Sequence, residues 1–213
     1  MFYFDNFKGK KVLKSSILED VTAFFTTREG MPELEAISPV QTHSDHVEIV
    51  DERKEYPDTD GLILTKLNTV ICLKFADCTP LIFYDPKRKI GAVTHAGWRG
   101  TAAKIGVKTI KKMVECGSAP QDIIAVIGPA IGLCCYEVSP EVRDKLLETV
   151  NDTTGLYKNR RVDLKKINAR QLEEVGVEKI DICQYCTSCN NDLFYSYRKE
   201  NGTTERHYAL LSL

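Results

Sequence analysis

The stretch from Lys89 to Gly100, KIGAVTHAGWRG, is the segment that most limits what the chain can fold into. Its apolar start predicts a buried strand, and the glycine that follows predicts a turn into a helix near Trp98. His95 at the strand end is a base or a metal ligand, and Arg99 adds a planar set of donors. The first turn of a helix attracts anions. The segment therefore predicts a site for an anion or a metal ion where a strand meets a helix.

Hydrophobic periodicity divides the remaining chain into short strands and a few helices. Strands are predicted over residues 21–26, 47–50, 61–65, 70–76, 81–84, 90–93, 122–127 and 177–182, with 193–197 and 207–211 as a closing antiparallel pair. Residues 70–95 are expected to form a meander of three buried strands. Helices are predicted over 98–116, from Ser139, and over 163–175. The expected fold class is α/β (α+β), a mixed β-sheet sandwich flanked by helices, in a single domain over residues 1–213.

Composition narrows the classes of function. The net charge of −1 creates no field that would attract nucleic acid or a membrane surface. No apolar run approaches the ~18 residues of a membrane-spanning helix, and the first residues do not resemble a signal peptide. The eight cysteines are therefore interpreted as reduced thiols or metal ligands. We expect a cytoplasmic protein without a nucleic-acid or membrane partner, and the sequence leaves its oligomeric state open.

Two histidines and a cysteine stand out because each lies at the end of a predicted strand. His43, Cys78 and His95 are far apart in sequence, yet such residues can converge on a zinc ion and leave its fourth position open. Each could equally be a packed or hydrogen-bonded loop residue. A different chemistry is available to the same residues, with Cys78 as a thiolate nucleophile and His95 as its base.

Further charged residues are candidates for supporting roles. Asp77 could orient a metal ligand or carry a proton, or it could simply bond its own backbone in a turn. Arg28, Arg99 and Arg198 fall in loops or at strand ends and suit an anion, although a single arginine of this kind is more often a surface residue. The loop over residues 128–132, GPAIG, could approach a ligand but lacks the lysine and serine of a phosphate loop.

The remaining cysteines give weaker signals. Cys183, Cys186 and Cys189 have a spacing seen in iron–sulfur proteins, but the fourth cysteine and the Cys-Pro of that motif are absent. The adjacent pair Cys134 and Cys135 is predicted to be buried packing rather than a redox couple.

The chain carries five motifs in this order: QTHSDHV, FADCTP, THAGWRG, IGPAIGLCCYEV and LFYSYRK. The segment FTTREG precedes them, and an Asp-Gly-Leu segment at Asp60 lies between the first two. Together they resemble the laccase-domain family, once called multicopper polyphenol oxidases and later recognised as purine nucleoside phosphorylases. The resemblance spans about residues 20–211. Each motif alone is unspecific, whereas the ordered set is highly specific. It implies a single α/β sandwich domain.

The resemblance also implies a ligand set and an activity. It implies zinc held by His43, Cys78 and His95, phosphorolysis of adenosine, inosine, guanosine and methylthioadenosine, and deamination of adenosine. The sequence departs from the family pattern at Ser44, where a glycine is usual, at Glu205 within the usual Thr-Gly-Arg, and at Ala130, where a cysteine is usual. None of these departures removes an implied zinc ligand.

The expected function is therefore a zinc-dependent purine nucleoside phosphorylase with adenosine deaminase activity. Arg99 and the helix start are expected to hold phosphate, with Arg28 and Arg198 as further candidates, and Asp77 and His46 are the candidate proton carriers. The main alternative is a metal-free cysteine hydrolase that uses Cys78 and His95. A non-enzymatic nucleotide or metal sensor is another. A copper-dependent polyphenol oxidase, the older label of the family, needs many more imidazoles than four histidines supply, so copper is the less favoured metal.

Overall fold

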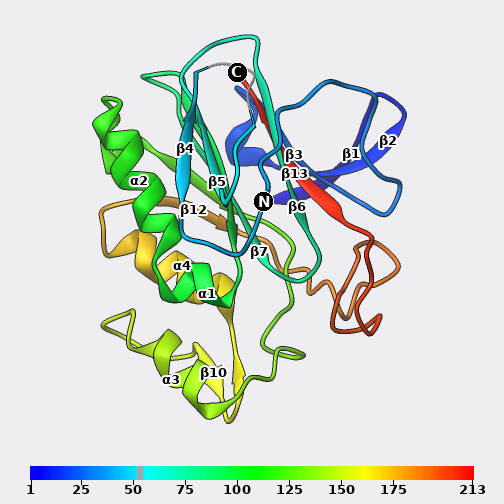
Figure 1. Ribbon diagram of the computed structural model, residues 1–213, viewed down its shortest axis with the longest axis vertical. Coiled ribbons are helices and arrows are strands. Elements are labelled where there is room, and N and C mark those ends of the chain that lie inside the picture. Colours follow the sequence, from blue (N-terminus) through cyan, green and yellow to red (C-terminus); the bar gives the residue numbers. More distant parts are fainter. Residues whose placement is uncertain (52–54) are drawn as a thin grey trace.

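Two β-sheets face each other, and helices cover the outer face of the larger sheet (Figure 1). The computed structural model describes residues 1–51 and 55–213. The smaller sheet is antiparallel, with the strand order β1 (Phe2–Phe7), β2 (Lys10–Ser15), β3 (Thr22–Thr26), β13 (His207–Ser212) and β6 (Val70–Phe75). The larger, mixed sheet has the order β12 (Lys179–Ile182), β9 (Ile124–Ile127), β7 (Thr79–Asp85), β8 (Ile90–Ala96), β5 (Gly61–Leu64) and β4 (Val47–Val50). The expected mixed α/β sandwich is confirmed.

The alternation of side chains along the strands builds two apolar layers. Leu62 and Leu64 of β5 point into the core between the sheets, whereas Ile63 points to the opposite face. That outer face packs against two helices, α2 (Ile105–Glu115) and α4 (Leu164–Glu173). A smaller cluster joins α4 to α1 (Trp98–Ala102), α3 (Pro140–Leu147) and the short ribbon of β10 (Tyr157–Lys158) and β11 (Arg161–Val162). The larger sheet is thus buried on both faces, which explains its almost continuous apolar strands.

The predicted meander over residues 70–95 is wrong in one respect. β7 and β8 do form an antiparallel hairpin, but β6 belongs to the other sheet, where it pairs with β13. The chain crosses from one sheet to the other at Asp77, whose backbone is in the left-handed region with φ of 84°. This crossing leaves Cys78 between the ends of the two sheets.

Three further expectations need correction. The helix predicted over 98–116 is two helices, because Lys104 adopts a left-handed conformation with φ of 57° and interrupts it. Residues 193–197 form turns rather than a strand, and β13 pairs instead with β3 and β6. The hairpin of β1 and β2 was absent from the predicted elements. None of the helices in the part of the chain that the structure describes is both long and apolar enough to span a membrane.

Candidate functional site

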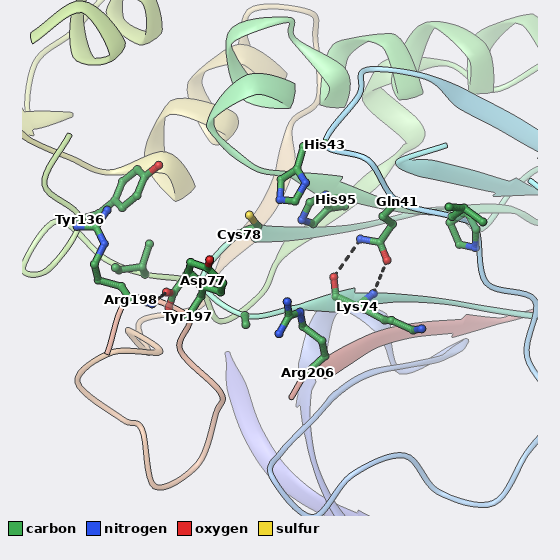
Figure 2. A pocket seen from close by; sticks show the side chains of 14 residues that line it. Gln41, His43, Lys74, Asp77, Cys78, His95, Tyr136, Tyr197, Arg198 and Arg206 are labelled. Atoms are coloured by element: carbon green, nitrogen blue, oxygen red, sulfur yellow. Dashed lines mark hydrogen bonds between the residues drawn. The ribbon is translucent and has the colours of Figure 1, made fainter. Parts of the chain in front are cut away.

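His43, Cys78 and His95 come together where the two sheets meet (Figure 2). His43 lies in the loop before β4, Cys78 directly before β7, and His95 near the end of β8. Their candidate ligand atoms all lie within 4.8 Å of one another, and the two imidazole rings are 4.8 Å apart between centroids in an edge-to-face arrangement. The three side chains singled out in the sequence therefore form one group in space.

Strand pairing and a glycine make this meeting possible. The register of β7 and β8 places Pro80 opposite His95 and Thr79 opposite Ala96, so Cys78 reaches the end of β8. Gly97 follows there, and a Cβ atom on it would lie 3.0 Å from Cys78 Sγ and 3.2 Å from His43 Cδ2. Any larger residue would push the cysteine and the histidine away, so the glycine of the THAGWRG motif makes room for the group.

Asp60 is the residue that the sequence reasoning missed. Its side chain is fully buried, and its Oδ1 lies 2.7 Å from His95 Nδ1. The carboxylate thereby orients the imidazole and leaves Nε2 as the nitrogen that can bind a metal. The pKa of Asp60 is lowered: burial opposes ionisation, but the hydrogen bond and positive charge of His95 outweigh it. An acid directly before an apolar strand was the usable signal in the sequence, because metal-binding histidines are commonly paired with a carboxylate.

The same carboxylate holds the loop that carries His43. Asp60 Oδ2 accepts hydrogen bonds from the backbone N–H groups of Thr42, at 3.1 Å, and Ser44, at 2.7 Å, one on each side of His43. It also accepts from the Ser44 hydroxyl at 3.0 Å. His43 itself has a left-handed backbone with φ of 63°, which costs about 1 kcal/mol or more for a residue other than glycine. Asp60 offsets this strain and so positions two members of the group at once.

Cys78 and His95 shift each other's ionisation. Burial opposes the charged form of Cys78, but the positive charge of His95 and hydrogen bonds from His43 and His95 lower its pKa to about 6. Burial likewise opposes the charged form of His95, whereas the Cys78 thiolate and the hydrogen bond to Asp60 raise its pKa to about 9. Without a metal, the pair is therefore a thiolate beside an imidazolium near neutral pH.

This ion pair predicts an unusually reactive thiol in metal-free protein. Because only the thiolate is nucleophilic, alkylation of Cys78 by iodoacetamide should rise with pH through a midpoint near 6. Cys116 is the internal control, since burial raises the pKa of its thiol and its reaction should begin only at higher pH. Peptide mass spectrometry after timed alkylation measures both rates. Equal pH midpoints for the two cysteines would contradict the ion pair.

A cavity of about 740 Å³ opens beside this group. The side chains that line it include Gln41, Lys74, Ile131, Tyr136, Tyr197, Arg198 and Arg206, together with Asp77 and the three metal-ligand candidates (Figure 2). Gln41 is held by two hydrogen bonds to the backbone of Lys74, at 2.8 and 3.0 Å. The cavity thus combines cationic, aromatic and apolar side chains on one side of a His–Cys–His group. Tyr136, Tyr197 and Arg206 lie in or beside the family motifs but were not predicted as site residues, and Lys74 had no distinguishing local pattern in the sequence.

Asp77 lines the cavity, but its carboxylate oxygens are already engaged. Oδ1 accepts from the Thr187 hydroxyl at 2.6 Å, and Oδ2 accepts from the backbone N–H of Arg198 at 2.7 Å. The Asp77 carbonyl in turn accepts from Ile131 N–H at 3.0 Å. Asp77 therefore ties together three loops that surround the cavity.

The four other predicted site residues are dispersed. Of these, Arg198 is the one that lines the cavity; its Nη1 donates to the Glu137 carbonyl at 3.1 Å. Arg28 forms an ion pair with Glu200 at 2.6 Å, and its Nε donates to the Asn191 carbonyl at 2.5 Å. Arg99 is exposed and stacks on Trp98, and His46 is exposed and pairs with Glu48 at 3.2 Å. Arg28, Arg99 and His46 do not line the cavity. Their side chains instead contact Glu200, Trp98 and Glu48, respectively.

A second group contains four cysteines: Cys134, Cys135, Cys186 and Cys189. The prediction that Cys134 and Cys135 are buried packing is wrong, since Cys134 is exposed and Cys135 half-buried. Cys183 is not in the group; it is fully buried in the core between the sheets. Cys183, Cys186 and Cys189, whose spacing is seen in iron–sulfur proteins, therefore do not form one set.

Comparison with known proteins adds to this geometry. Residues 16–213 match the family described as multi-copper polyphenol oxidoreductase laccase. The chain is 36% identical over 192 residues to purine nucleoside phosphorylase YlmD of Bacillus subtilis, which covers 81% of this chain and 69% of that protein. The crystal structure of YlmD from Geobacillus stearothermophilus superposes with a TM-score of 0.89 at 28% identity, covering 100% of this chain and 99% of that one. The hypothetical protein YfiH of Bacillus licheniformis superposes with a TM-score of 0.87 at 30% identity, covering 99% and 98%.

The family match spans nearly the whole sequence, and the solved relatives share the complete sandwich. The matched residues include His43, Cys78 and His95. The relatives that the chain matches include proteins named purine nucleoside phosphorylase. On these grounds the chain belongs to the laccase-domain family, which is described as multi-copper polyphenol oxidoreductase laccase.

Proposed function

We propose that this protein is a zinc-dependent purine nucleoside phosphorylase. It would convert adenosine, inosine, guanosine and methylthioadenosine with phosphate into the free base and the sugar 1-phosphate, and it would also deaminate adenosine. The observation that carries the proposal is the His43, Cys78 and His95 group at the edge of a cavity lined by arginines and tyrosines. The names of the relatives support the same activity. We also propose that residues 1–213 act as one domain.

The donor set suits zinc. Two imidazoles and one thiolate are ligands that zinc accepts, and three protein ligands leave a position for substrate or water, as in catalytic zinc sites. The low pKa of Cys78 and the orientation of His95 by Asp60 both favour metal binding, because the ligands must be deprotonated and correctly aimed. When bound, zinc supplies Lewis acidity, which polarises a substrate atom and makes a water molecule more acidic.

The cavity offers contacts suited to both substrates. Tyr136 and Tyr197 present aromatic surface suited to a purine ring, with Ile131 beside them. Arg198 and Arg206 are each anchored through Nη1 to main-chain carbonyls, and the rest of each guanidinium carries further donors for a phosphate. Lys74 adds a third cation at the rim. A volume of about 740 Å³ accommodates a nucleoside together with phosphate.

The proposed reaction is a substitution at the anomeric carbon. A phosphate oxygen forms a bond to C1′ while the bond from C1′ to the purine nitrogen breaks, and the purine leaves with the electron pair and takes up a proton. The transition state carries positive charge on the sugar, so an anion held against C1′ stabilises it. Arg198 and Arg206 would provide that positioning, and Asp77 would hold the Arg198 loop in place.

The test is product formation with and without phosphate. Zinc-loaded protein incubated with inosine should release hypoxanthine and ribose 1-phosphate only when phosphate is present, and incubation with adenosine should give inosine without phosphate. Liquid chromatography with mass spectrometry measures both. Arg198→Ala should raise the KM for phosphate about tenfold or more, whereas Arg160→Ala, outside the cavity, should leave it unchanged. Absence of phosphate-dependent base release from all four nucleosides would refute the proposal.

A metal-free cysteine hydrolase is a second candidate, and one observation favours it. Cys78, His95 and Asp60 follow the order of thiolate, imidazole and carboxylate found in nucleophilic triads, with His95 Nδ1 2.7 Å from Asp60. Chelator-resistant hydrolysis of amides that stops on Cys78 alkylation would support this candidate, while loss of activity on zinc removal supports the phosphorylase. The copper oxidase label has less support, because His46 and His207 lie away from the His43 and His95 group and cannot complete a multicopper centre.

A further inference from the structure

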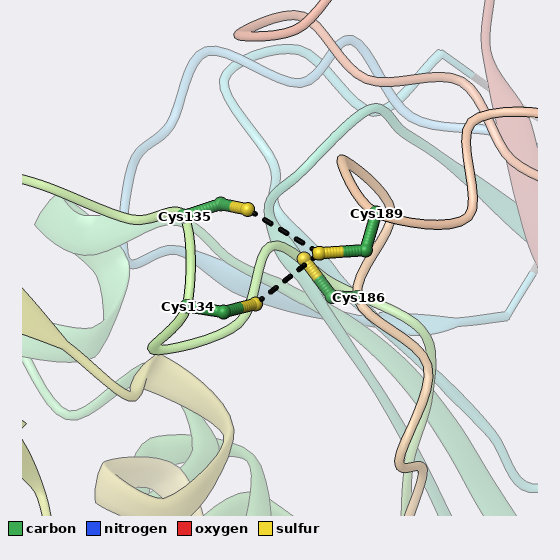
Figure 3. Close-up of side chains that lie close together, drawn as sticks. All are labelled: Cys134, Cys135, Cys186 and Cys189. Atoms are coloured by element: carbon green, nitrogen blue, oxygen red, sulfur yellow. Dashed lines mark hydrogen bonds between the residues drawn. The ribbon is translucent and has the colours of Figure 1, made fainter.

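Two loops bring four cysteine sulfurs together (Figure 3). Cys134 and Cys135 lie in the loop after β9, and Cys186 and Cys189 lie in the segment after β12. All four sulfurs lie within 4.8 Å of one another, and Cys189 Sγ is 3.4 Å from both Cys134 Sγ and Cys135 Sγ. All four are free thiols.

These distances fit one metal ion and no larger cluster. A tetrahedral zinc ion with four thiolates at about 2.3 Å holds its sulfurs about 3.8 Å apart. The observed separations, from 3.4 Å up to a limit of 4.8 Å, bracket this value. A polynuclear iron–sulfur cluster would need its cysteines further apart, because several irons and bridging sulfides lie between them.

The backbone is arranged to present the thiols to a common centre. A turn in which Cys135 N–H and Tyr136 N–H both donate to the Gly132 carbonyl, each at 2.9 Å, lets two adjacent cysteines face the same way. Gly132 N–H donates to Cys186 Sγ at 3.2 Å, a bond of the kind that stabilises a metal-bound thiolate. Burial opposes ionisation of Cys186, but the pKa of this thiol is lowered by this bond and by one from the Cys189 backbone.

The two loops are also fixed to each other and to the core. Thr187 N–H donates to the Ala130 carbonyl at 3.1 Å, and Ala130 and Cys186 form a parallel bridge. Lys165, a buried lysine on α4, donates through Nζ to the carbonyls of Cys183, at 2.6 Å, and Tyr185, at 3.0 Å. The cysteines are therefore preorganised rather than gathered at random on a mobile surface.

We propose that Cys134, Cys135, Cys186 and Cys189 hold a structural zinc ion, separate from the His43, Cys78 and His95 group. Four protein thiolates fill a tetrahedral coordination sphere, so this ion has no open position for substrate and serves to crosslink the two loops.

The crosslink bears on the cavity, because both loops continue into its wall. Ile131 and Tyr136 flank the first cysteine pair, and Tyr197 and Arg198 follow the second. Loss of the ion should therefore loosen one side of the cavity and raise KM for substrates, with a smaller effect on kcat. It should also lower the thermal stability of the protein, since an ion that binds only the folded chain shifts the folding equilibrium.

The test counts metal ions per chain in protein purified in a reducing, zinc-containing buffer. Native mass spectrometry should find two zinc ions in the wild type and one in Cys189→Ser, and the melting temperature of the variant should fall. Cys183→Ala is the matched control. Cys183 is spaced in the sequence like Cys186 and Cys189 but lies outside the four-cysteine group, so this variant should keep both ions. Cobalt substitution gives an independent signal, because thiolate-to-cobalt charge-transfer bands gain intensity with each thiolate bound, so Cys189→Ser should weaken them strongly.

Cys78→Ala separates this proposal from the proposed activity. It should lose the other zinc ion and keep the cobalt bands of the four-thiolate site, whatever nucleoside chemistry the protein performs. The proposal is overturned if the wild type and Cys189→Ser bind the same number of zinc ions. It is also overturned if the purified wild type carries iron at the cluster, or a disulfide among these four cysteines when prepared under reducing conditions.

Discussion

Replacing Asp60 by asparagine is expected to weaken zinc binding at the His43, Cys78 and His95 group about tenfold to a hundredfold. Asp60 Oδ2 must stay an acceptor for three donors from Thr42 and Ser44, so the new amide NH₂ would take the place of Oδ1 and face His95 Nδ1. His95 Nδ1 would then have to accept, and its proton would move to Nε2, the nitrogen that zinc needs. The substitution is nearly isosteric, so its effect reports on the tautomer rather than on packing.

The measurement should be specific for this site, because the four cysteines are proposed to bind a second ion. Zinc bound by this group is expected to protect Cys78 from alkylation, so the zinc concentration that halves its alkylation rate would give the affinity of this group alone. Asp58→Asn is the matched control: Asp58 lies on the same loop and accepts from the Thr42 hydroxyl, yet it does not contact His95. Unchanged protection in Asp60→Asn would show that the carboxylate does not set the tautomer of His95.

Replacing Asp77 by alanine is expected to destabilise the fold by about 3 kcal/mol. The substitution removes the acceptor of the buried Thr187 hydroxyl and of the part-buried Arg198 N–H, and it leaves the Thr187 hydroxyl unsatisfied. Position 77 also has φ of 84°, which alanine tolerates poorly. For a chain of this size the melting temperature should fall by about 6 to 12 °C, and denaturant unfolding measures the loss directly.

Kinetics decide whether Asp77 has a role beyond holding loops. If it is a positioning residue, Asp77→Ala should raise KM for nucleoside and phosphate more than it lowers kcat, because the Arg198 backbone loses its hydrogen bond to the Asp77 carboxylate. Asp77→Asn keeps one acceptor and tolerates the left-handed backbone, so it should recover much of the stability and of the KM. A variant as stable as the wild type but with kcat abolished would instead identify Asp77 as a proton carrier.

The sequence-based predictions succeeded where the signal was local. The strands over 47–50, 61–64 and 79–85 follow from runs of apolar and β-branched residues, and the order of the motifs was enough to identify the family. The predictions failed where distant partners decide the structure. Residues 193–197 look like a strand but form turns, because β13 is already paired on both edges, with β3 and β6. Asp60 was missed because its partner His95 lies on another strand.

The sequence by itself determined which residue types are available for chemistry, and it singled out the two histidines and the cysteine that the structure brings together. Only the tertiary structure decided which charged residues join them. It placed Arg198 and Arg206 at the cavity and left Arg28, Arg99 and His46 outside its lining. It also separated Cys183 from the cysteine cluster that its spacing had suggested. The physical reason is that strand order and loop crossing set distances between residues far apart in the chain, and no local periodicity encodes them.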